Sequence, residues 1–261
     1  MNKKNDNAKP FYIWEGVYTN FDEAVSKSKG SGFSGEIYLD RSLKVAKECL
    51  KNIQLKKPIE SFHKQRSTYL PCVVASILLE NSRTKILDFG GGFGIGYMVL
   101  NESIGSKIED IDYSIIEVPN VCEIASKIHQ NNINYITSFS NLDEFDLVHA
   151  SSSIQYVKDW KGLLEKFTTL KPKYILLSDI FAGEIETFVT LQNYYDSLIP
   201  HWFLNINELN DVLDKLGYSL IMKSYVSSRR LGFEDFLPMK NFPNACRIDQ
   251  TLHLLFKKIK S

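Results

Sequence analysis

The chain has 261 residues, of which 44% are hydrophobic and 24% are charged, as is typical of globular proteins. Its 31 Lys and Arg residues balance 31 Asp and Glu residues, so the formal net charge at pH 7 is zero. Proteins that bind nucleic acid usually carry a basic excess, because neutralising phosphates supplies much of their affinity. The balanced charge therefore argues against nucleic acid as the main partner.

Cysteine and histidine spacing excludes the common metal and disulfide frameworks. The four cysteines include no CxxC pair, and the 5 histidines show no HxxxH or HExxH spacing, so we expect reduced thiols and no metal site. The polar N-terminus does not resemble a signal peptide, and no apolar stretch approaches the roughly 18 residues that span a bilayer. A cytoplasmic location without a membrane span is the expectation.

The first 80 residues are predicted to form helices and loops, with no convincing strand. Asn20, followed three residues later by Glu23, makes a capping box at the start of a helix. The Gly/Ser-rich stretch 30–35 predicts a flexible loop. Further helices are expected over residues 41–51 and 59–80, the second kinked or divided at Pro71.

After residue 82, strands alternate with helices, which predicts a parallel sheet with helices on both faces. No helix signal separates the last two strands, so we expect them to form an antiparallel pair at the end of the sheet. The predicted strands span residues 85–89, 112–116, 134–137, 145–150, 174–178, 218–226 and 251–259. The predicted helices span residues 97–102, 121–129, 160–170, 186–197 and 208–216.

The first of these strands ends in a glycine-rich turn, Asp88-Phe89-Gly90-Gly91-Gly92-Phe93-Gly94. Glycines let the backbone turn sharply and let a ligand approach it closely. The dinucleotide fingerprint GxGxxG fails here, because Ile95 and Tyr97 occupy the positions of its third glycine. The phosphate-binding pattern GxxxxGK[ST] also fails, because Gly96 is followed by Tyr97-Met98.

Two acidic residues indicate which ligand the turn suits. A carboxylate at Asp88 would repel a pyrophosphate, but it suits cationic groups such as an ammonium beside a sulfonium. Glu117 ends the second strand, where an acidic side chain can accept hydrogen bonds from two ribose hydroxyls. An adenosine with a cationic amino-acid tail therefore fits better than a dinucleotide.

This pattern resembles the class I S-adenosylmethionine-dependent methyltransferases. The residues that match motif I and the ribose-binding acid of that superfamily are Asp88, Gly90, Gly91, Gly92, Gly94 and Glu117. The resemblance implies a Rossmann-like α/β fold with seven strands, the last antiparallel. It also implies S-adenosylmethionine as cofactor and S-adenosylhomocysteine as product.

Further cofactor contacts follow from the same resemblance. It places Ser138 and Phe139, after the third strand, beside the adenine, and Ser151, after the fourth strand, near the methionine part. Residues 81–261 would then form the cofactor-binding domain, and residues 1–80 a helical, aromatic cap that binds the acceptor. The aromatic residues of the cap either stack on a sugar or base or form the cap's own small core: Phe11, Tyr12, Trp14 and Tyr18.

Several separated motifs resemble a bacterial methyltransferase family often encoded in surface-polysaccharide (O-antigen or capsule) gene clusters. They are Trp14-Glu15-Gly16-Val17-Tyr18, Asp88-Phe89-Gly90-Gly91-Gly92, Glu117-Val118-Pro119, Ser151-Ser152-Ser153-Ile154-Gln155-Tyr156 with Asp159-Trp160, and Pro200-His201-Trp202-Phe203. The resemblance implies O-methylation of a small sugar, nucleotide-linked or phosphate- or phosphoramidate-bearing precursor. It does not identify the acceptor.

The acceptor decides which catalytic group is needed. A neutral hydroxyl needs a base, and His201, expected in a loop after the fifth strand at the edge of the site, is the first candidate, although a surface or packing histidine is the simpler interpretation. Tyr156 would either orient the acceptor or have a core or surface role. His149, inside a predicted strand, is expected to be structural.

An anionic oxygen, already a nucleophile, calls for cations instead. His63 and Arg66 share a helix face, and Arg229 and Arg230 lie in the long connection 227–249, which is a candidate lid. Arg66 with Arg229 or Arg230 would bind a phosphate group bidentately, whereas each charge alone also fits a solvated surface.

Two other classes of function remain open at this point. Asp110-Ile111-Asp112 has the DxD form of sugar-nucleotide-dependent glycosyltransferases, although it falls at the start of a strand. A non-catalytic S-adenosylmethionine-binding scaffold would share the fold, but the complete glycine and acid set argues against it.

Overall fold

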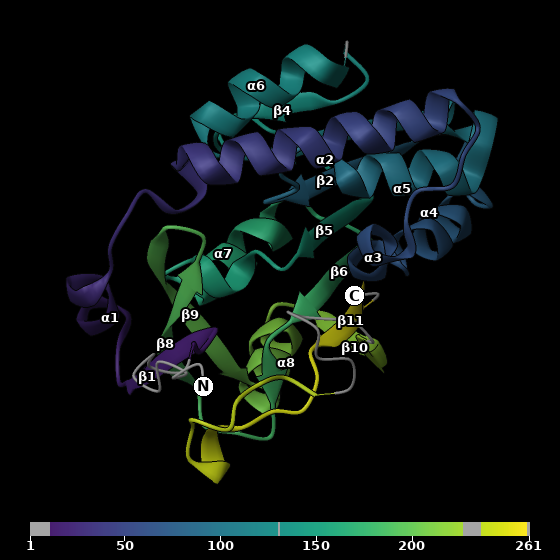
Figure 1. Cartoon of the computed structure of the whole chain (residues 1–261). Coiled ribbons are helices and arrows are strands. Elements are labelled where there is room, and N and C mark those ends of the chain that lie inside the picture. The colour runs from purple at the N-terminus through teal and green to yellow at the C-terminus, as the bar shows by residue number, and fades with distance from the viewer. Residues whose placement is uncertain (1–10, 130, 227–235, 260–261) are drawn as a thin grey trace, which may run out of the picture.

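The computed structural model describes residues 11–129, 131–226 and 236–259, and a seven-stranded sheet is its largest element (Figure 1). The strand order is β10-β11-β6-β5-β2-β3-β4, and every pairing is parallel except those that β11 makes with β6 and β10. The predicted Rossmann-like sheet and its closing antiparallel pair are confirmed. The strands are β2 (Thr84–Phe89), β3 (Ile111–Ile116), β4 (Asn134–Ile136), β5 (Leu147–Ser151), β6 (Tyr174–Ile180), β10 (Tyr218–Tyr225) and β11 (Leu252–Lys258).

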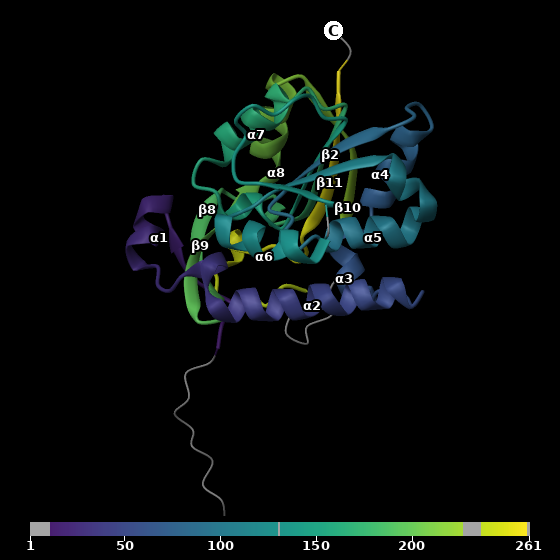
Figure 2. The ribbon, with the colours of Figure 1, turned by 90° about the horizontal axis from the view of Figure 1, so that it is seen from above.

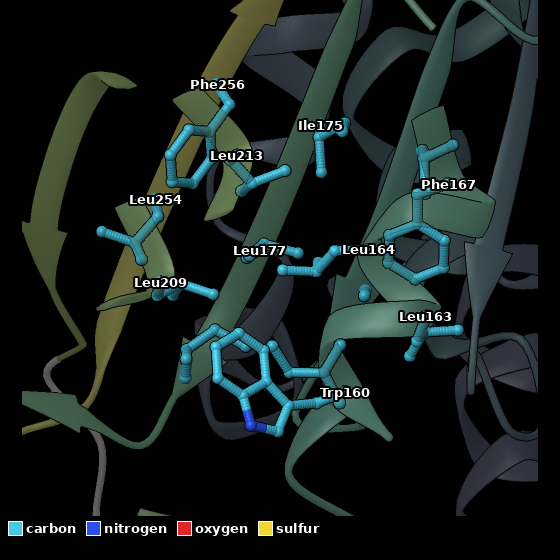
Figure 3. Close-up of a cluster of buried hydrophobic side chains, with 14 of the residues drawn as sticks. Trp160, Leu163, Leu164, Phe167, Ile175, Leu177, Leu209, Leu213, Leu254 and Phe256 are labelled. Carbon is cyan, nitrogen blue, oxygen red and sulfur yellow. The ribbon is translucent and has the colours of Figure 1, made fainter. Parts of the chain in front are cut away.

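Helices cover both faces of this sheet. Its central strands are almost continuously buried, as strands with helices on both sides must be. One face carries α7 and α8, whose apolar residues point at β6 and β11 (Figure 3). The other face carries α4 and α5. The helices are α1 (Phe21–Lys27), α2 (Glu36–Gln54), α3 (Ser61–Lys64), α4 (Leu70–Leu78), α5 (Ile95–Ile104), α6 (Pro119–His129), α7 (Trp160–Thr169) and α8 (Ile206–Lys215).

The early helices follow the predicted local signals with one adjustment. Asn20 caps α1, its side-chain oxygen accepting a hydrogen bond from the Glu23 backbone N–H at 2.9 Å. The predicted helix over residues 59–80 is divided into α3, a 3₁₀ turn and α4. Pro71 lies in the first turn of α4, where a proline sacrifices no helical hydrogen bond, so it begins a helix instead of kinking one.

A second, four-stranded sheet contradicts two expectations. Its order is β1-β8-β9-β7, so the first 80 residues do contain a strand, and the helix expected over residues 186–197 is a β-hairpin. Residues 188–191 form a buried run of apolar and β-branched side chains, which favour strands, and the pairing with neighbouring strands outweighs the helical pattern seen in the sequence. The strands are β1 (Trp14–Tyr18), β7 (Ala182–Gly183), β8 (Phe188–Tyr194) and β9 (Ser197–Asn205).

The N-terminal segment and the hairpin lie over the carboxyl ends of the parallel strands. Helix α2 packs along α5 and α6 (Figure 2), and the rings of Tyr38 from α2 and Tyr194 from the hairpin lie 5.8 Å apart, centroid to centroid. None of the helices in the described part of the chain combines the length and apolar character that crossing a membrane requires.

Candidate active site

The turn between β2 and α5 favours glycine, by backbone conformation at three positions and by lack of space at a fourth. Gly90, Gly92 and Gly94 have φ angles of +68°, +57° and +76°, in the left-handed region that disfavours side chains. Gly91 has no such angle, but a β-carbon there would lie 2.5 Å from Asp88 Oδ2. The turn is therefore a bare backbone surface at the carboxyl end of β2.

Asp88 is buried at the floor of this turn. Its Oδ2 accepts a hydrogen bond from the Tyr113 hydroxyl at 2.8 Å, and its Oδ1 lies 2.9 Å from Nδ1 of His149. Burial, and then the Asp88 carboxylate, raise the pKa of Tyr113 well above its usual value, so this phenol remains a donor. Asp88 and His149 both line a cavity, so the carboxylate faces the ligand space while its neighbours hold it in place.

Glu117 connects the end of β3 to the glycine turn. Its Oε1 accepts a hydrogen bond from the Gly92 backbone N–H at 3.1 Å, and its Oε2 accepts one from the Val118 N–H at 2.8 Å. Burial raises the pKa of Glu117, although these two backbone bonds oppose the shift. A half-buried carboxylate fixed by two backbone donors is a pre-oriented acceptor for ligand hydroxyls.

Two cavities open beside these groups. The first, of about 670 Å³, is lined by Asp88, His149 and residues 90–93 of the turn. The second, of about 630 Å³, is lined by Glu117, Thr137 and residues 151–153. Five residues line both cavities and mark where they meet: Tyr38, Arg66, Gly90, Ser151 and Tyr194.

The structure brings together most of the cofactor residues expected from the sequence. Gly90, Gly91 and Gly92 line the first cavity, and Ser151, which also donates a hydrogen bond to the Arg66 carbonyl at 3.2 Å, lines both. Gly94 lines neither cavity. A β-carbon at this position would lie 2.7 Å from Ile133 Cδ1 and 2.8 Å from His129 Nε2. Gly94 is thus required for packing behind the turn.

The adenine contacts expected after the third strand are placed differently. Thr137 lines the second cavity, whereas Ser138 and Phe139 line neither. The Phe139 ring packs on Phe89 at 5.9 Å between centroids, as part of the core. Contact of Ser138 or Phe139 with an adenine therefore stays a prediction.

Arg66 is the cation that the structure brings into the site. Its Nε lies 3.0 Å from Oδ2 of Asp179, while its own side chain remains 53% exposed toward the cavities. Asp179 is fully buried with a φ of +53°, and its Oδ1 accepts a hydrogen bond from the Thr251 hydroxyl at 2.6 Å. His63 lines the first cavity as well. Arg229 and Arg230 lie outside the described residues.

Asp179 and Thr251 were not among the expected site residues. The signal for Asp179 was present, since a carboxylate within the buried run of β6 needs a partner. Its left-handed backbone belongs to the strained conformations that concentrate at functional sites. Thr251 carries no comparable signal, because a lone threonine at a strand end is common.

Five aromatic residues surround the junction of the cavities, and we call them the aromatic collar: Phe33, Tyr38, Tyr156, Tyr194 and Tyr195. The Phe33 ring lies 4.8 Å from that of Tyr156 and 5.3 Å from that of Tyr194, between centroids. Tyr156, an expected site residue, donates a hydrogen bond to Gln192 Oε1 at 2.8 Å. Burial raises the pKa of Tyr38 and of Tyr194 far above the usual value, so both phenols stay neutral.

His201 does not lie where the sequence suggested. It belongs to β9 and is fully buried, with ring centroids 4.5 Å from Phe181, 5.2 Å from Tyr156 and 5.9 Å from Trp14. The expected open loop is wrong because this segment is an inner strand of the second sheet. His201 lines neither cavity, and Trp14 of the N-terminal aromatic segment belongs to the same packed cluster.

Comparison with known proteins agrees with this geometry. A model of the methyltransferase domain family matches residues 62–223, more than half of the chain. The phosphoethanolamine N-methyltransferase of Plasmodium falciparum (isolate 3D7) is 23% identical over 158 residues, which cover 56% of this chain and 58% of that protein. The chain thus spans less than two thirds of the length of this relative.

The fold is shared with a solved methyltransferase structure. The 1,6-didemethyltoxoflavin-N1-methyltransferase of Burkholderia thailandensis, with bound 1,6-didemethyltoxoflavin and S-adenosylhomocysteine, has a TM-score of 0.50 at 12% identity, covering 84% of this chain and 89% of that one. The magnesium protoporphyrin IX methyltransferase of Synechocystis PCC 6803, with bound S-adenosylmethionine, has a TM-score of 0.48 at 13% identity, covering 77% and 86%.

The glycosyltransferase alternative is wrong. Asp110 and Asp112 lie at the amino end of β3, away from the glycine turn, and Asp112 is ion-paired with Arg83 at 2.7 Å. The bare turn and the fixed Glu117 carboxylate suit an adenosine with an amino-acid tail. The family match over residues 62–223 shows that the chain belongs to the methyltransferase domain family.

Proposed function

We propose that this methyltransferase acts on an oxygen of a small acceptor that carries an anionic group, a phosphate above all. The observation that carries the proposal is the Arg66–Asp179 ion pair at the junction of the two cavities. Asp179 contacts the Arg66 guanidinium at Nε. The two terminal amino groups of Arg66 are therefore left to face a ligand, and a guanidinium binds phosphate or carboxylate bidentately. Sugar phosphates, nucleotide-linked sugars and phosphoramidates belong to this class.

The residues around the junction of the two cavities have different roles in the reaction. Bound S-adenosylmethionine supplies a methyl group on a positively charged sulfur, and transfer requires an acceptor in line with it. Glu117 and the glycine turn hold the cofactor side, Arg66 and His63 orient the acceptor, and the aromatic collar excludes water. An anionic oxygen needs no base, which agrees with the burial of His201 away from both cavities.

Two further observations support this acceptor class. The phosphoethanolamine N-methyltransferase of P. falciparum is named for an acceptor that carries a phosphate. The sequence motifs resemble a family encoded with surface-polysaccharide genes, whose precursors include sugar phosphates. We propose O-methylation of such a precursor, in O-antigen or capsule biosynthesis.

We also propose that residues 1–80 form the acceptor-binding cap. They contribute Tyr38, Arg41, His63 and Arg66 to the cavity walls. The same segment contributes Phe33 to the aromatic collar. Residues 81–261 would then hold mainly the cofactor.

Calorimetry on Arg66 variants tests the proposal. Inorganic phosphate is titrated into protein saturated with S-adenosylhomocysteine, and S-adenosylhomocysteine is titrated separately. Arg66→Ala should weaken phosphate binding by about tenfold or more, because the bidentate donor is lost, and leave S-adenosylhomocysteine affinity within about twofold. Arg66→Lys should restore only part of the phosphate affinity.

Arg83→Ala is the matched control. Arg83 is another partly exposed arginine paired with a carboxylate, but it lies at the opposite end of the sheet. Its loss should change neither titration. If Arg66→Ala instead abolishes S-adenosylhomocysteine binding and leaves phosphate binding intact, Arg66 serves the cofactor carboxylate and the anionic acceptor is refuted.

A further inference from the structure

The tip of the β8–β9 hairpin has an unusual residue at its turn. Tyr194 pairs with Ser197, so Tyr195 and Asp196 form a two-residue loop, and Tyr195 has a φ of +54°. Two-residue hairpin loops place glycine, asparagine or aspartate where φ is positive, because a larger side chain is strained there. A tyrosine at this position opposes the preference of the turn.

The tip is held in place by the Gly/Ser-rich loop of the N-terminal segment. Lys29 and Leu198 exchange two backbone hydrogen bonds, of 2.9 and 2.8 Å. The Ser197 hydroxyl accepts a hydrogen bond from the Gly32 N–H at 3.0 Å, and a β-carbon on Gly30 would lie 2.4 Å from that hydroxyl oxygen. The direction of the Tyr195 side chain is therefore set by a docked backbone.

That direction takes the Tyr195 ring to the wall of the first cavity. The ring centroid lies 4.7 Å from that of Tyr194 and 6.2 Å from that of Tyr38. The Arg41 guanidinium lies over the ring, 5.1 Å from its centroid. Tyr195 is nevertheless 46% exposed, whereas the rest of the collar is half-buried. A tyrosine with a strained backbone and with a braced, partly exposed ring on a cavity wall is poorly explained by packing.

We propose that Tyr195 is a binding surface for a ring of the acceptor, so that the substrate class is a cyclic compound whose acidic group reaches Arg66. The inference rests on the anionic acceptor proposed above. Arg66 and Tyr195 line the same cavity, so one ligand reaches both. Arg41 braces the tyrosine by a cation–π contact, and the accessible part of the ring offers a flat apolar surface to a sugar or aromatic ring.

The test compares phosphates with and without a ring, titrated calorimetrically into protein saturated with S-adenosylhomocysteine. The probes are inorganic phosphate, glucose 1-phosphate and phenyl phosphate. At least one of the two ring-bearing probes should bind wild type at least about tenfold more tightly than inorganic phosphate does. Tyr195→Gly should reduce that preference to within about twofold, and Tyr195→Phe should keep it.

Thermal unfolding gives the second readout. Tyr195→Gly should melt at a higher temperature than wild type, because glycine adopts the positive φ without strain. A tyrosine that served only packing would give the opposite result, a lower melting temperature with the ring preference unchanged. Tyr225→Ala, which removes another exposed tyrosine on β10, is the control and should leave the preference for a ring unaltered.

The outcomes separate this inference from the proposed function. Absence of phosphate binding that depends on Arg66 overturns both. Phosphate binding that depends on Arg66, with no gain from a ring or with a gain that survives Tyr195→Gly, overturns the inference alone. A lower melting temperature for Tyr195→Gly also overturns it, because the tyrosine would then be kept for stability.

Discussion

The cofactor side and the acceptor side of the cleft are built in different ways. Asp88, residues 90–92 and Glu117 come from two neighbouring strands, β2 and β3, and a direct hydrogen bond joins Gly92 to Glu117. The acceptor side is assembled from α2, the turn that carries Arg66, the β8–β9 hairpin and the end of β6. A parallel sheet always leaves ligand groups at the carboxyl ends of its strands, whereas the acceptor side depends on long-range pairing of β1 with β8.

The two sides also differ in charge. The Asp88 and Glu117 carboxylates lie on the cofactor side, whereas the acceptor side carries the guanidinium groups of Arg41 and Arg66, the second of them paired with the Asp179 carboxylate. This arrangement suits a cationic methyl donor and an anionic acceptor. The zero net charge of the chain is thus compatible with a cleft whose two sides carry different charged groups.

The largest effect is expected on the cofactor side, at Gly91. A β-carbon there would lie 2.5 Å from Asp88 Oδ2 and 3.1 Å from Ile115 Cγ1, and both neighbours are buried. Gly91→Ala should lower the free energy of unfolding by about 3 kcal/mol and abolish S-adenosylhomocysteine binding. Urea denaturation and calorimetry measure the two effects.

Gly105→Ala is the control for backbone strain. Gly105 has a φ of +58°, but no atom lies within 4 Å of the β-carbon position. Its substitution should cost only about 1 kcal/mol and leave cofactor binding unchanged. If Gly91→Ala is as stable as Gly105→Ala, the tight turn is not what fixes the cofactor side.

A smaller effect is expected at His201, in the packed cluster behind the acceptor side. His201→Ala should lower the free energy of unfolding by about 2 kcal/mol, because it opens a cavity among Trp14, Phe181 and Phe203. Affinity for S-adenosylhomocysteine and inorganic phosphate, measured on folded protein, should stay within about twofold. His63→Ala is the matched histidine control, with little cost in stability but weaker phosphate binding. Loss of phosphate binding in folded His201→Ala would show that His201 contributes to acceptor binding.

His201 also shows where inference from the sequence ends. The positions of Gly90 and Glu117 were predictable from the sequence. Local patterns mark the ends of their strands, and ligand groups lie at the carboxyl ends of the strands in a parallel sheet. The hairpin was not predictable, because residues 188–194 become a strand only through β1 and β9 beside them. The partners of Asp179 were hidden for a related reason, since Arg66 and Thr251 are distant from it in sequence.

The finest test of the cofactor side is the pH dependence of Glu117. Burial raises its pKa above the ordinary value of 4.5, and ribose hydroxyls require the charged carboxylate. S-adenosylhomocysteine affinity should therefore fall as pH drops through the raised pKa, by about tenfold in all, and then level off where Glu117 is fully protonated. Glu117→Gln should bind about tenfold more weakly at neutral pH and show no such dependence. Glu123→Gln, on the exposed face of α6, is the control and should behave as wild type.

The same group should act on stability with the opposite sign. Because the folded protein holds the Glu117 proton more tightly than the unfolded chain, its stabilising contribution is complete below the unfolded pKa. That contribution is lost as pH rises through the folded pKa. Over this pH interval the ligand-free protein should gain stability on acidification while it loses cofactor affinity, and Glu117→Gln should remove both trends. A wild-type protein whose cofactor affinity does not change over this interval would show that Glu117 is not the ribose acceptor, and the cofactor side would then rest on the glycine turn alone.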